Sequence, residues 1–154
     1  MAWPGAAGRG GGIFNPEFIR GSFRRTGGGF MDKTRRSDLR ADLQNLVRGD
    51  EWCLRGHLPG DPLLPGVLLV EAAAQLAGVV AQNDPEVSPL PELKLTALRA
   101  VKILGTARPG ETIRVEARVT GRLGNLIQAK AEAFLGDKLL LTAELTLAGQ
   151  PVQK

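Results

Sequence analysis

The sequence predicts an α+β fold in which a curved antiparallel sheet encloses one long central helix. Three observations predict it: residues 67–82 are apolar on nearly every face, strand-like segments follow from residue 93 onward, and turn residues separate these segments. A helix that is apolar all round must be covered by other elements, and a sheet can supply that cover. At 154 residues, 43% of them hydrophobic, the chain has the size and balance of one globular domain.

Residues 1–36 are predicted to be a flexible leader, followed by a folded domain over 37–149 and a tail over 150–154. Nine of the 20 glycines lie in the first thirty residues, and the apolar residues there follow no period. Such a segment cannot bury enough surface to offset its ordering entropy. An expression-derived or over-extended start, with Met31 as the true first residue, is favoured over a Ser-rich transit peptide.

The net charge of +4 is concentrated in this leader. Residues 1–40 hold eight Lys/Arg and three Asp/Glu, so the other 114 residues are close to neutral. Nucleic-acid binding needs a basic stripe on the folded domain, so it is not expected. Membrane insertion is not expected either, because the apolar run over 66–81 is too short and contains Glu71. A single cysteine, Cys53, and no export signal predict a cytoplasmic protein.

Before the helix, the sequence predicts a strand and then a loop. Residues 37–53 partly alternate between apolar and polar, which favours a strand that ends in a turn at Gly49. Residues 56–66 contain three prolines and three glycines, which fix an irregular backbone path. Pro65 and Gly66 stand where the helix would begin.

Four further strands are predicted over residues 93–104, 111–121, 125–135 and 138–148. The clearest alternation is in the second of them, where the apolar positions are Ile113, Val115, Ala117 and Val119. Short connections predict that the four strands are successive antiparallel neighbours; they carry Pro109-Gly110, Gly124-Asn125 and Gly136-Asp137. One sheet cannot cover both the helix and its own edges, so we expect self-association through an edge strand.

The inventory of reactive side chains excludes several chemistries. With one histidine and one cysteine, a four-ligand Cys/His zinc site cannot form within one chain. None of the serines lies in a nucleophile-elbow sequence, and no Walker-type phosphate loop occurs. Acid/base catalysis by a histidine and a carboxylate remains.

Two residues are candidates for that role. Glu71 is surrounded by apolar residues of the predicted helix, and carboxylates are rarely buried without a partner or a task. Burial raises a carboxyl pKa and keeps a proton available near neutrality. His57 precedes the Pro/Gly-dense loop. Structural alternatives stay open: His57 as an ordinary surface residue, and Glu71 hydrogen-bonded to Gln75 or to loop amides.

Residues 56–75, GHLPGDPLLPGVLLVEAAAQ, resemble the active-site motif of the 3-hydroxyacyl-acyl-carrier-protein dehydratases. That family has a His-x-Pro-Gly loop, then Pro-Gly-Val-Leu, then Glu-Ala-x-Ala-Gln, with the same spacing as from His57 to Glu71. The acid on the predicted helix is Glu rather than Asp, and in this respect the chain resembles the branch of the family that dehydrates without isomerising the double bond. The resemblance continues through VKILGTARPGETIRVEARV, residues 101–119, and covers roughly residues 40–148.

The resemblance implies a hot-dog fold and dehydration of (3R)-hydroxyacyl thioesters without a cofactor or metal. It implies that His57 removes the C2 proton and that Glu71, supplied by a partner subunit, protonates the departing hydroxyl. The free amides at the start of the helix would stabilise charge on the thioester oxygen. The implied substrate-binding residues surround this point: Leu58, Pro65, Gly66, Val67 and Gln75.

Further expectations concern partners and departures from the family. The substrate would be carried by acyl carrier protein or coenzyme A, with Arg55, Arg99 and Lys102 as candidate contacts for the acidic carrier, and the assembly would be a homodimer or a trimer of dimers. Leu58 replaces the family's aromatic residue, and Trp52 and Cys53 its preceding aromatic pair. These positions border the acyl tunnel in the family, so the resemblance does not determine the length of the acyl chain. Two alternatives stay open: a hot-dog acyl thioesterase and a non-catalytic acyl-binding subunit.

Overall fold

The computed structural model describes residues 40–50, 52–84 and 86–150, so the predicted leader over 1–36 and all but the first residue of the predicted tail lie outside the described residues. The predicted helix and all five predicted strands are present. In chain order the elements are β1 (Arg40–Leu46), the short 3-10 helix η2 (Trp52–Leu54), α1 (Gly66–Gln82), β2 (Lys94–Ile103), β3 (Thr112–Leu123), β4 (Leu126–Leu135) and β5 (Lys138–Ala148).

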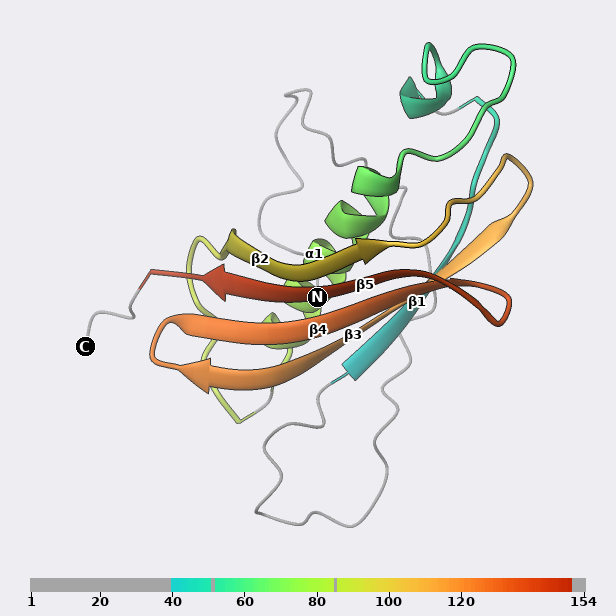
Figure 1. Ribbon diagram of the computed structural model, residues 1–154. Helices are drawn as coiled ribbons and strands as arrows, with labels where there is room; N and C mark the ends of the chain where they lie inside the picture. Colours follow the sequence, from blue (N-terminus) through green and yellow to red (C-terminus); the bar gives the residue numbers. More distant parts are fainter. Residues whose placement is uncertain (1–39, 51, 85, 151–154) are drawn as a thin grey trace.

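The helix α1 lies across one face of the curved sheet, so the predicted α+β arrangement is confirmed (Figure 1). It contacts all five strands and packs mainly on β3 and β4. The strands turn small or aliphatic side chains toward it; on β4 these are Ile127, Ala129, Ala131 and Ala133, all buried. Because three of these four are alanines, the helix can lie close to the sheet and fill the core without large side chains.

The sheet has the order β1-β3-β4-β5-β2, and every neighbouring pair is antiparallel. The predicted hairpins β3–β4 and β4–β5 are confirmed. Their turns contain Gly124 with φ 58° and Gly136 with φ 57°, in the left-handed region that glycine reaches without a steric penalty. The alternation predicted for β3 is also confirmed, since Ile113, Val115 and Ala117 are buried.

The prediction that β2 and β3 are neighbours is wrong. β2 pairs with β5 at one edge, whereas β3 pairs with β1 near the other. The Pro109-Gly110 turn closes no hairpin with β2, because its backbone bonds to the residue after β1: Gly110 N donates to Val47 O at 2.8 Å, and Val47 N donates to Glu111 O at 2.9 Å. The connection therefore carries the chain from one side of the sheet to the other.

β2 is an edge strand with little cover. Nine of its ten residues are exposed, only Val101 being partly buried, although the strand includes Leu95, Leu98 and Ile103. Its pairing with β5 is interrupted by a bulge between Arg99 and Lys102, next to Ala100 with φ 48°. An apolar edge of this kind is open to pairing with another strand.

Within the described residues, no helix is long and apolar enough to cross a membrane.

Candidate active site

His57 lies in the loop that joins η2 to α1, and this loop has an unusual backbone. Three of its residues have positive φ: Gly56 at 81°, Leu58 at 48° and Gly60 at 87°. Asp61 N donates to Leu58 O at 3.0 Å, which closes a tight turn directly after His57. Glycine adopts such angles freely, but Leu58 does so under strain, and residues strained in this way are held by their surroundings.

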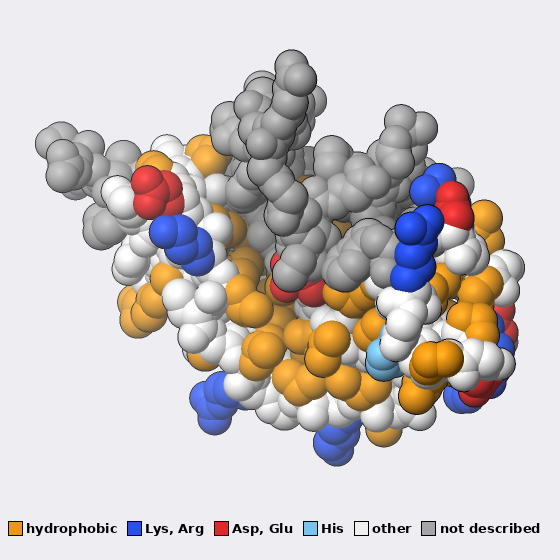
Figure 2. All heavy atoms as spheres, turned by 90° about the horizontal axis from the view of Figure 1, so that it is seen from above, with side chains coloured by type: hydrophobic (Ala, Val, Ile, Leu, Met, Phe, Trp, Pro, Cys, Tyr) orange, Lys and Arg blue, Asp and Glu red, His pale blue; other side chains and the backbone are white. Residues whose placement is uncertain are grey.

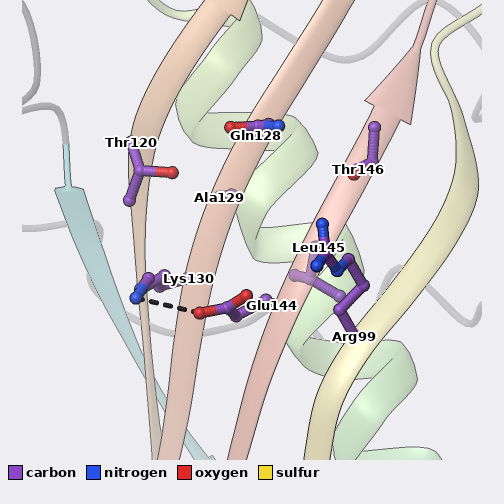
Figure 3. A pocket seen from close by; sticks show the side chains of 8 residues that line it. All are labelled: Arg99, Thr120, Gln128, Ala129, Lys130, Glu144, Leu145 and Thr146. Atoms are coloured by element: carbon purple, nitrogen blue, oxygen red, sulfur yellow. Dashed lines mark ion pairs between the residues drawn. The ribbon is translucent and has the colours of Figure 1, made fainter.

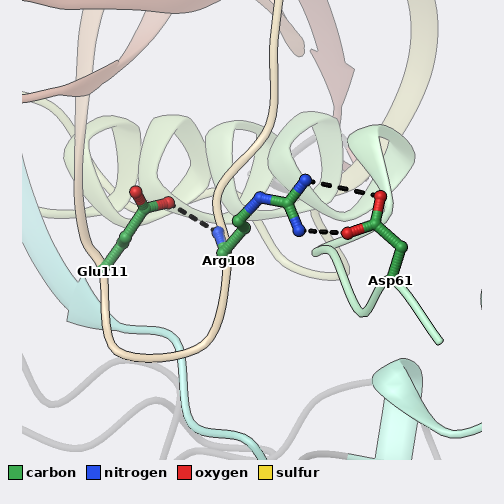
Figure 4. Close-up of polar contacts among 3 residues, drawn as sticks. All are labelled: Asp61, Arg108 and Glu111. Atoms are coloured by element: carbon green, nitrogen blue, oxygen red, sulfur yellow. Dashed lines mark hydrogen bonds and ion pairs between the residues drawn. The ribbon is translucent and has the colours of Figure 1, made fainter.

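Polar contacts tie this loop to the segment between β2 and β3. Leu64, a buried residue near the end of the loop, donates its N–H to Ala107 O at 2.8 Å and accepts a hydrogen bond from Thr106 Oγ1. Asp61 forms an ion pair with Arg108, in which both guanidinium nitrogens Nη1 and Nη2 donate to the carboxylate (Figure 4). The hydrogen bond from Arg108 holds the pKa of Asp61 below its usual range.

The start of α1 is uncapped and closely packed. No side chain at Pro65 caps the helix, so the first amides, those of Gly66 and Val67, point out of the helix end without an intrahelical partner. A Cβ at Gly66 would lie 2.7 Å from Ile103 Cγ2 of β2. A side chain at this position would therefore displace either the start of α1 or the Ile103 side chain.

Glu71 lies one and a half turns into α1 and is half-buried between the buried residues Val70 and Ala72. Removal from water raises the pKa of its carboxyl group. Among the residues that the structure describes, none forms a hydrogen bond or ion pair with Glu71, so the carboxyl group has neither Gln75 nor a loop amide as a partner there. A half-buried carboxyl group without a partner is a marker of functional sites.

His57 and Glu71 do not contact each other through a hydrogen bond or ion pair within the described part of one chain. His57 is exposed, as are its neighbour Leu58 and Val67 in the first turn of α1. Pro65 and Gln75 are half-buried. The loop joins α1 at Pro65, whereas Glu71 and Gln75 lie further along the helix.

The three basic residues suggested as carrier contacts are all exposed, but they lie in different places. Arg55 belongs to the His57 loop, whereas Arg99 and Lys102 belong to β2. Arg99 lines a shallow polar pocket on the sheet face away from α1, with the ion pair between Lys130 and Glu144 at 2.9 Å (Figure 3). The side chain of Trp52 lies outside what the structure describes, and Cys53 is buried.

Sequence reasoning missed the pair formed by Asp61 and Arg108. The two residues are 47 positions apart, and each has an ordinary explanation where it stands, as a polar residue in a loop and a charged residue before a turn. Only the crossing of the β2–β3 connection past the His57 loop brings them together. No local pattern in the sequence carries that information.

Comparison with known proteins identifies the family. Residues 34–144 match the family model of the FabA-like domain. The chain is 34% identical over 109 residues to the 3-hydroxyacyl-[acyl-carrier-protein] dehydratase FabZ of Moorella thermoacetica, covering 71% of this chain and 76% of that protein. It is 36% identical over 106 residues to the FabZ of Clostridioides difficile, covering 66% and 71%.

Solved structures agree on the fold. The dehydratase heterocomplex ApeI:P from Xenorhabdus doucetiae gives a TM-score of 0.59 at 20% identity over 73% of this chain and 76% of that one. Zebra fish thioesterase superfamily member 2 gives 0.57 at 14% identity over 72% and 75%. At these identities the likeness shows the hot-dog fold, which dehydratases and thioesterases share, and the sequence matches choose between them: the chain belongs to the FabZ-type 3-hydroxyacyl-acyl-carrier-protein dehydratase family.

Proposed function

We propose that this chain removes water from (3R)-hydroxyacyl thioesters to form trans-2-enoyl thioesters in fatty-acid biosynthesis, with His57 and Glu71 as its acid/base pair. The family supports the reaction. The structural observation that carries the assignment is Glu71, a half-buried carboxyl group whose pKa is raised by desolvation and which has no partner among the described residues. Such a group retains a proton that it can donate.

In the proposed step, the imidazole of His57 takes the C2 proton of the substrate. The electron pair of the C2–H bond forms the C2=C3 double bond as the C3–O bond breaks. Glu71 gives its proton to the leaving hydroxyl, which departs as water. Transfer of the proton from His57 back to Glu71 through solvent restores the starting state, so the reaction balances without a cofactor or a metal.

The uncapped start of α1 would stabilise the charge that develops on the thioester oxygen. The amides of Gly66 and Val67 stand at the positive end of the helix, where a carbonyl oxygen can accept hydrogen bonds from them. Leu58, Pro65 and Gln75 would line the acyl chain on either side. Positioned donors of this kind contribute about 10²–10³ in rate when aimed at an oxyanion.

Glu71 of one subunit would act with His57 of another. β2 supports this arrangement, because its open edge exposes apolar side chains beside the start of α1. Figure 2 views the molecule from above, the side on which β2 is the uppermost strand in Figure 1, and hydrophobic side chains gather there. The exposed apolar residues of β2 and of the start of α1 include Val67, Leu95, Leu98 and Ile103. The proposed assembly is a homodimer joined through β2, alone or as a trimer of dimers.

The substrate would be carried by acyl carrier protein or coenzyme A, in the cytoplasm. Arg55, Arg99 and Lys102 are exposed cations that an acidic carrier protein would contact at the dimer. The sequence has a single cysteine, Cys53, so no disulfide can form within the chain, which suits a reducing compartment.

A single assay tests the reaction against the thioesterase alternative. The protein is incubated with crotonyl thioesters of acyl carrier protein and of coenzyme A, and loss of enoyl absorbance is followed together with release of free thiol. Hydration without thiol release is expected. Thiol release without hydration would favour a thioesterase, and neither signal would favour an acyl-binding subunit.

Two variants test the catalytic pair. His57→Ala and Glu71→Ala are each expected to lower kcat for hydration by about 10² or more, since positioned acid/base groups contribute about 10²–10⁴. Lys130→Gln, which alters an exposed ion pair on the outer sheet face, is the matched control and should keep full activity. Light scattering should show the same oligomer in all three variants. Full activity in either alanine variant would overturn the assignment.

A further inference from the structure

We infer that the ion pair between Asp61 and Arg108 is a positioning device that holds His57 in its working orientation. The inference rests on the proposed function and goes beyond it, because neither residue would touch the substrate. It follows from how the His57 loop is built and from where its attachments lie (Figure 4).

The loop needs an external attachment because its own backbone is strained next to His57. Leu58, the residue that follows His57, has φ 48°, and glycines with positive φ stand on either side at Gly56 and Gly60. The turn is closed by the hydrogen bond from Asp61 N to Leu58 O. A conformation of this kind persists when the surrounding structure holds it in place. Asp61 links Leu58 to that structure, because its N–H bonds to Leu58 O and its carboxylate bonds to Arg108.

Arg108 is itself fixed to the sheet. Its backbone N–H donates to Glu111 Oε2 at 2.6 Å, and Glu111 N donates back to Arg108 O at 3.1 Å. The same turn bonds to Val47, immediately after β1, through Gly110 and Glu111. The guanidinium group therefore extends from a braced turn, and its two-pronged contact fixes both the position and the plane of the Asp61 carboxylate.

This contact is distinctive within the loop. Among the described residues, the only hydrogen bonds or ion pairs that tie residues 55–63 to another part of the chain are those between Asp61 and Arg108. The next attachment is Leu64, seven residues after His57. Without the ion pair, the segment between the buried Leu54 and the buried Leu64, which contains His57, would have no hydrogen bond or ion pair to the rest of the described chain.

A stabilising role alone would give a different result from a positioning role. Both side chains are more than half exposed, and exposed ion pairs contribute little to global stability. Loss of the pair should therefore leave the melting temperature almost unchanged while it misplaces His57. Misplacement of a catalytic group lowers kcat more than it weakens substrate binding.

The experiment compares the full-length wild-type protein with Asp61→Asn, Arg108→Gln, Arg108→Lys and the exchanged pair Asp61→Arg/Arg108→Asp, using crotonyl thioester hydration. Asp61→Asn and Arg108→Gln are each expected to lower kcat by about tenfold and to change KM by less than about twofold. The exchanged pair is expected to recover most of the lost kcat. Arg108→Lys, which keeps the charge but loses the two-pronged contact, should fall between wild type and Arg108→Gln.

Two controls separate the possible outcomes. Lys130→Gln disrupts an ion pair of similar exposure on the outer sheet face and should leave kcat unchanged. Amide hydrogen exchange of the peptide covering residues 55–63 should speed up in Asp61→Asn and not in Lys130→Gln, whether or not the thioester is the right substrate. Absence of hydration by the wild-type protein would contradict the proposed function, and the exchange measurement would still test the attachment.

Unchanged kcat in both Asp61→Asn and Arg108→Gln beside an active wild type would overturn the inference. So would a fall in kcat matched by a lower melting temperature and not repaired by the exchanged pair. Faster exchange in the loop without any change in kcat would show a structural attachment only and would equally overturn the positioning role.

Discussion

Glu71 combines two properties that stability alone does not favour. It is half-buried among the apolar residues of α1, and it has no hydrogen bond or ion pair within the described part of the chain. An ionised carboxylate in that setting loses hydration without compensation, which is why the pKa of Glu71 is raised. Retention of such a residue is understandable if its proton is used in catalysis.

The raised pKa predicts a pH-dependent effect of Glu71→Gln on stability. In the unfolded chain the carboxyl group titrates near its ordinary value of 4.5, whereas in the folded protein it holds its proton to higher pH. The folded state thus binds the proton more tightly. The resulting stability is fully present below the unfolded pKa and is lost as pH rises through the folded pKa.

Glutamine resembles the protonated acid and does not titrate, so the variant should escape this loss. The melting temperature of Glu71→Gln minus that of wild type should increase as pH is raised from about 4.5 toward neutrality. Calorimetry at constant ionic strength measures it. Glu132→Gln, which removes an exposed carboxylate on β4, is the control and should show a flat difference. A difference that shrinks with pH for Glu71→Gln would contradict the burial argument.

At the residue scale, the two candidate catalytic groups could be predicted from the sequence, but the ion pair that attaches the His57 loop to the rest of the chain could not. Glu71 is recognisable because a carboxylate in an apolar run is costly wherever that run is buried. His57 is recognisable from its place before the Pro/Gly-dense loop. Asp61 and Arg108 carry no comparable local signal, because their contact depends on the path of the β2–β3 connection.

At the scale of elements, local turns were predictable and strand order was not. Gly124 and Gly136 adopt positive φ, so the two hairpins that they join are encoded at the turns themselves. The pairing of β2 with β5 is not encoded in this way. The two strands are neighbours in the sheet, but β3 and β4 lie between them in the sequence, so no turn joins them directly. Pro109-Gly110 has the composition of a hairpin turn, but its backbone is bonded to Val47. Contacts distant in sequence decided the order.

The contact between α1 and β2 predicts the effect of a substitution at Gly66. A methyl group there would lie 2.7 Å from Ile103 Cγ2, so Gly66→Ala must displace the Ile103 side chain or the start of α1, and we expect the helix start to move. Overpacking of this kind costs about 1–3 kcal/mol. Denaturant unfolding of the variant should show a loss in that range, together with lower hydration activity because the first amides of α1 move.

Removal of the opposing side chain should relieve the clash. The double variant Gly66→Ala/Ile103→Ala is expected to be more stable than the sum of the two single effects, with a coupling of about 1 kcal/mol or more in a double-mutant cycle. Ile103→Ala alone provides the other corner of the cycle. Strict additivity would mean that the close approach between Gly66 and Ile103 does not constrain the helix start.

For the molecule as a whole, the sequence predicted the layers of the fold because they follow from burial. An apolar helix over residues 67–82 requires cover, and the alternation in β3 shows which face provides it. The same reasoning anticipated an open edge but not which strand forms it. In the structure it is β2 that stands beside the start of the helix with its apolar side chains exposed. A dimer joined through β2 is the arrangement that we propose for a shared site.

A shared site predicts complementation between two inactive variants. If His57 of one subunit works with Glu71 of the other, a heterodimer of His57→Ala and Glu71→Ala contains one site with both residues intact and one with neither. The two chains are co-expressed with different affinity tags, and the heterodimer is purified through both tags. Its kcat per dimer should be about half that of the wild-type dimer. In a two-fold symmetric dimer both substitutions fall in the same site, so the other site is intact.

A site formed within a single chain gives the opposite result, since each subunit of the heterodimer would then lack one group. The doubly tagged sample would be as inactive as either parent, and the proposal that the sites are shared would have to be withdrawn. A heterodimer of two His57→Ala chains carrying the same two tags is the matched control, and it should stay inactive under both arrangements. Recovery of activity in the mixed heterodimer alone would require the two groups to meet across the subunit boundary.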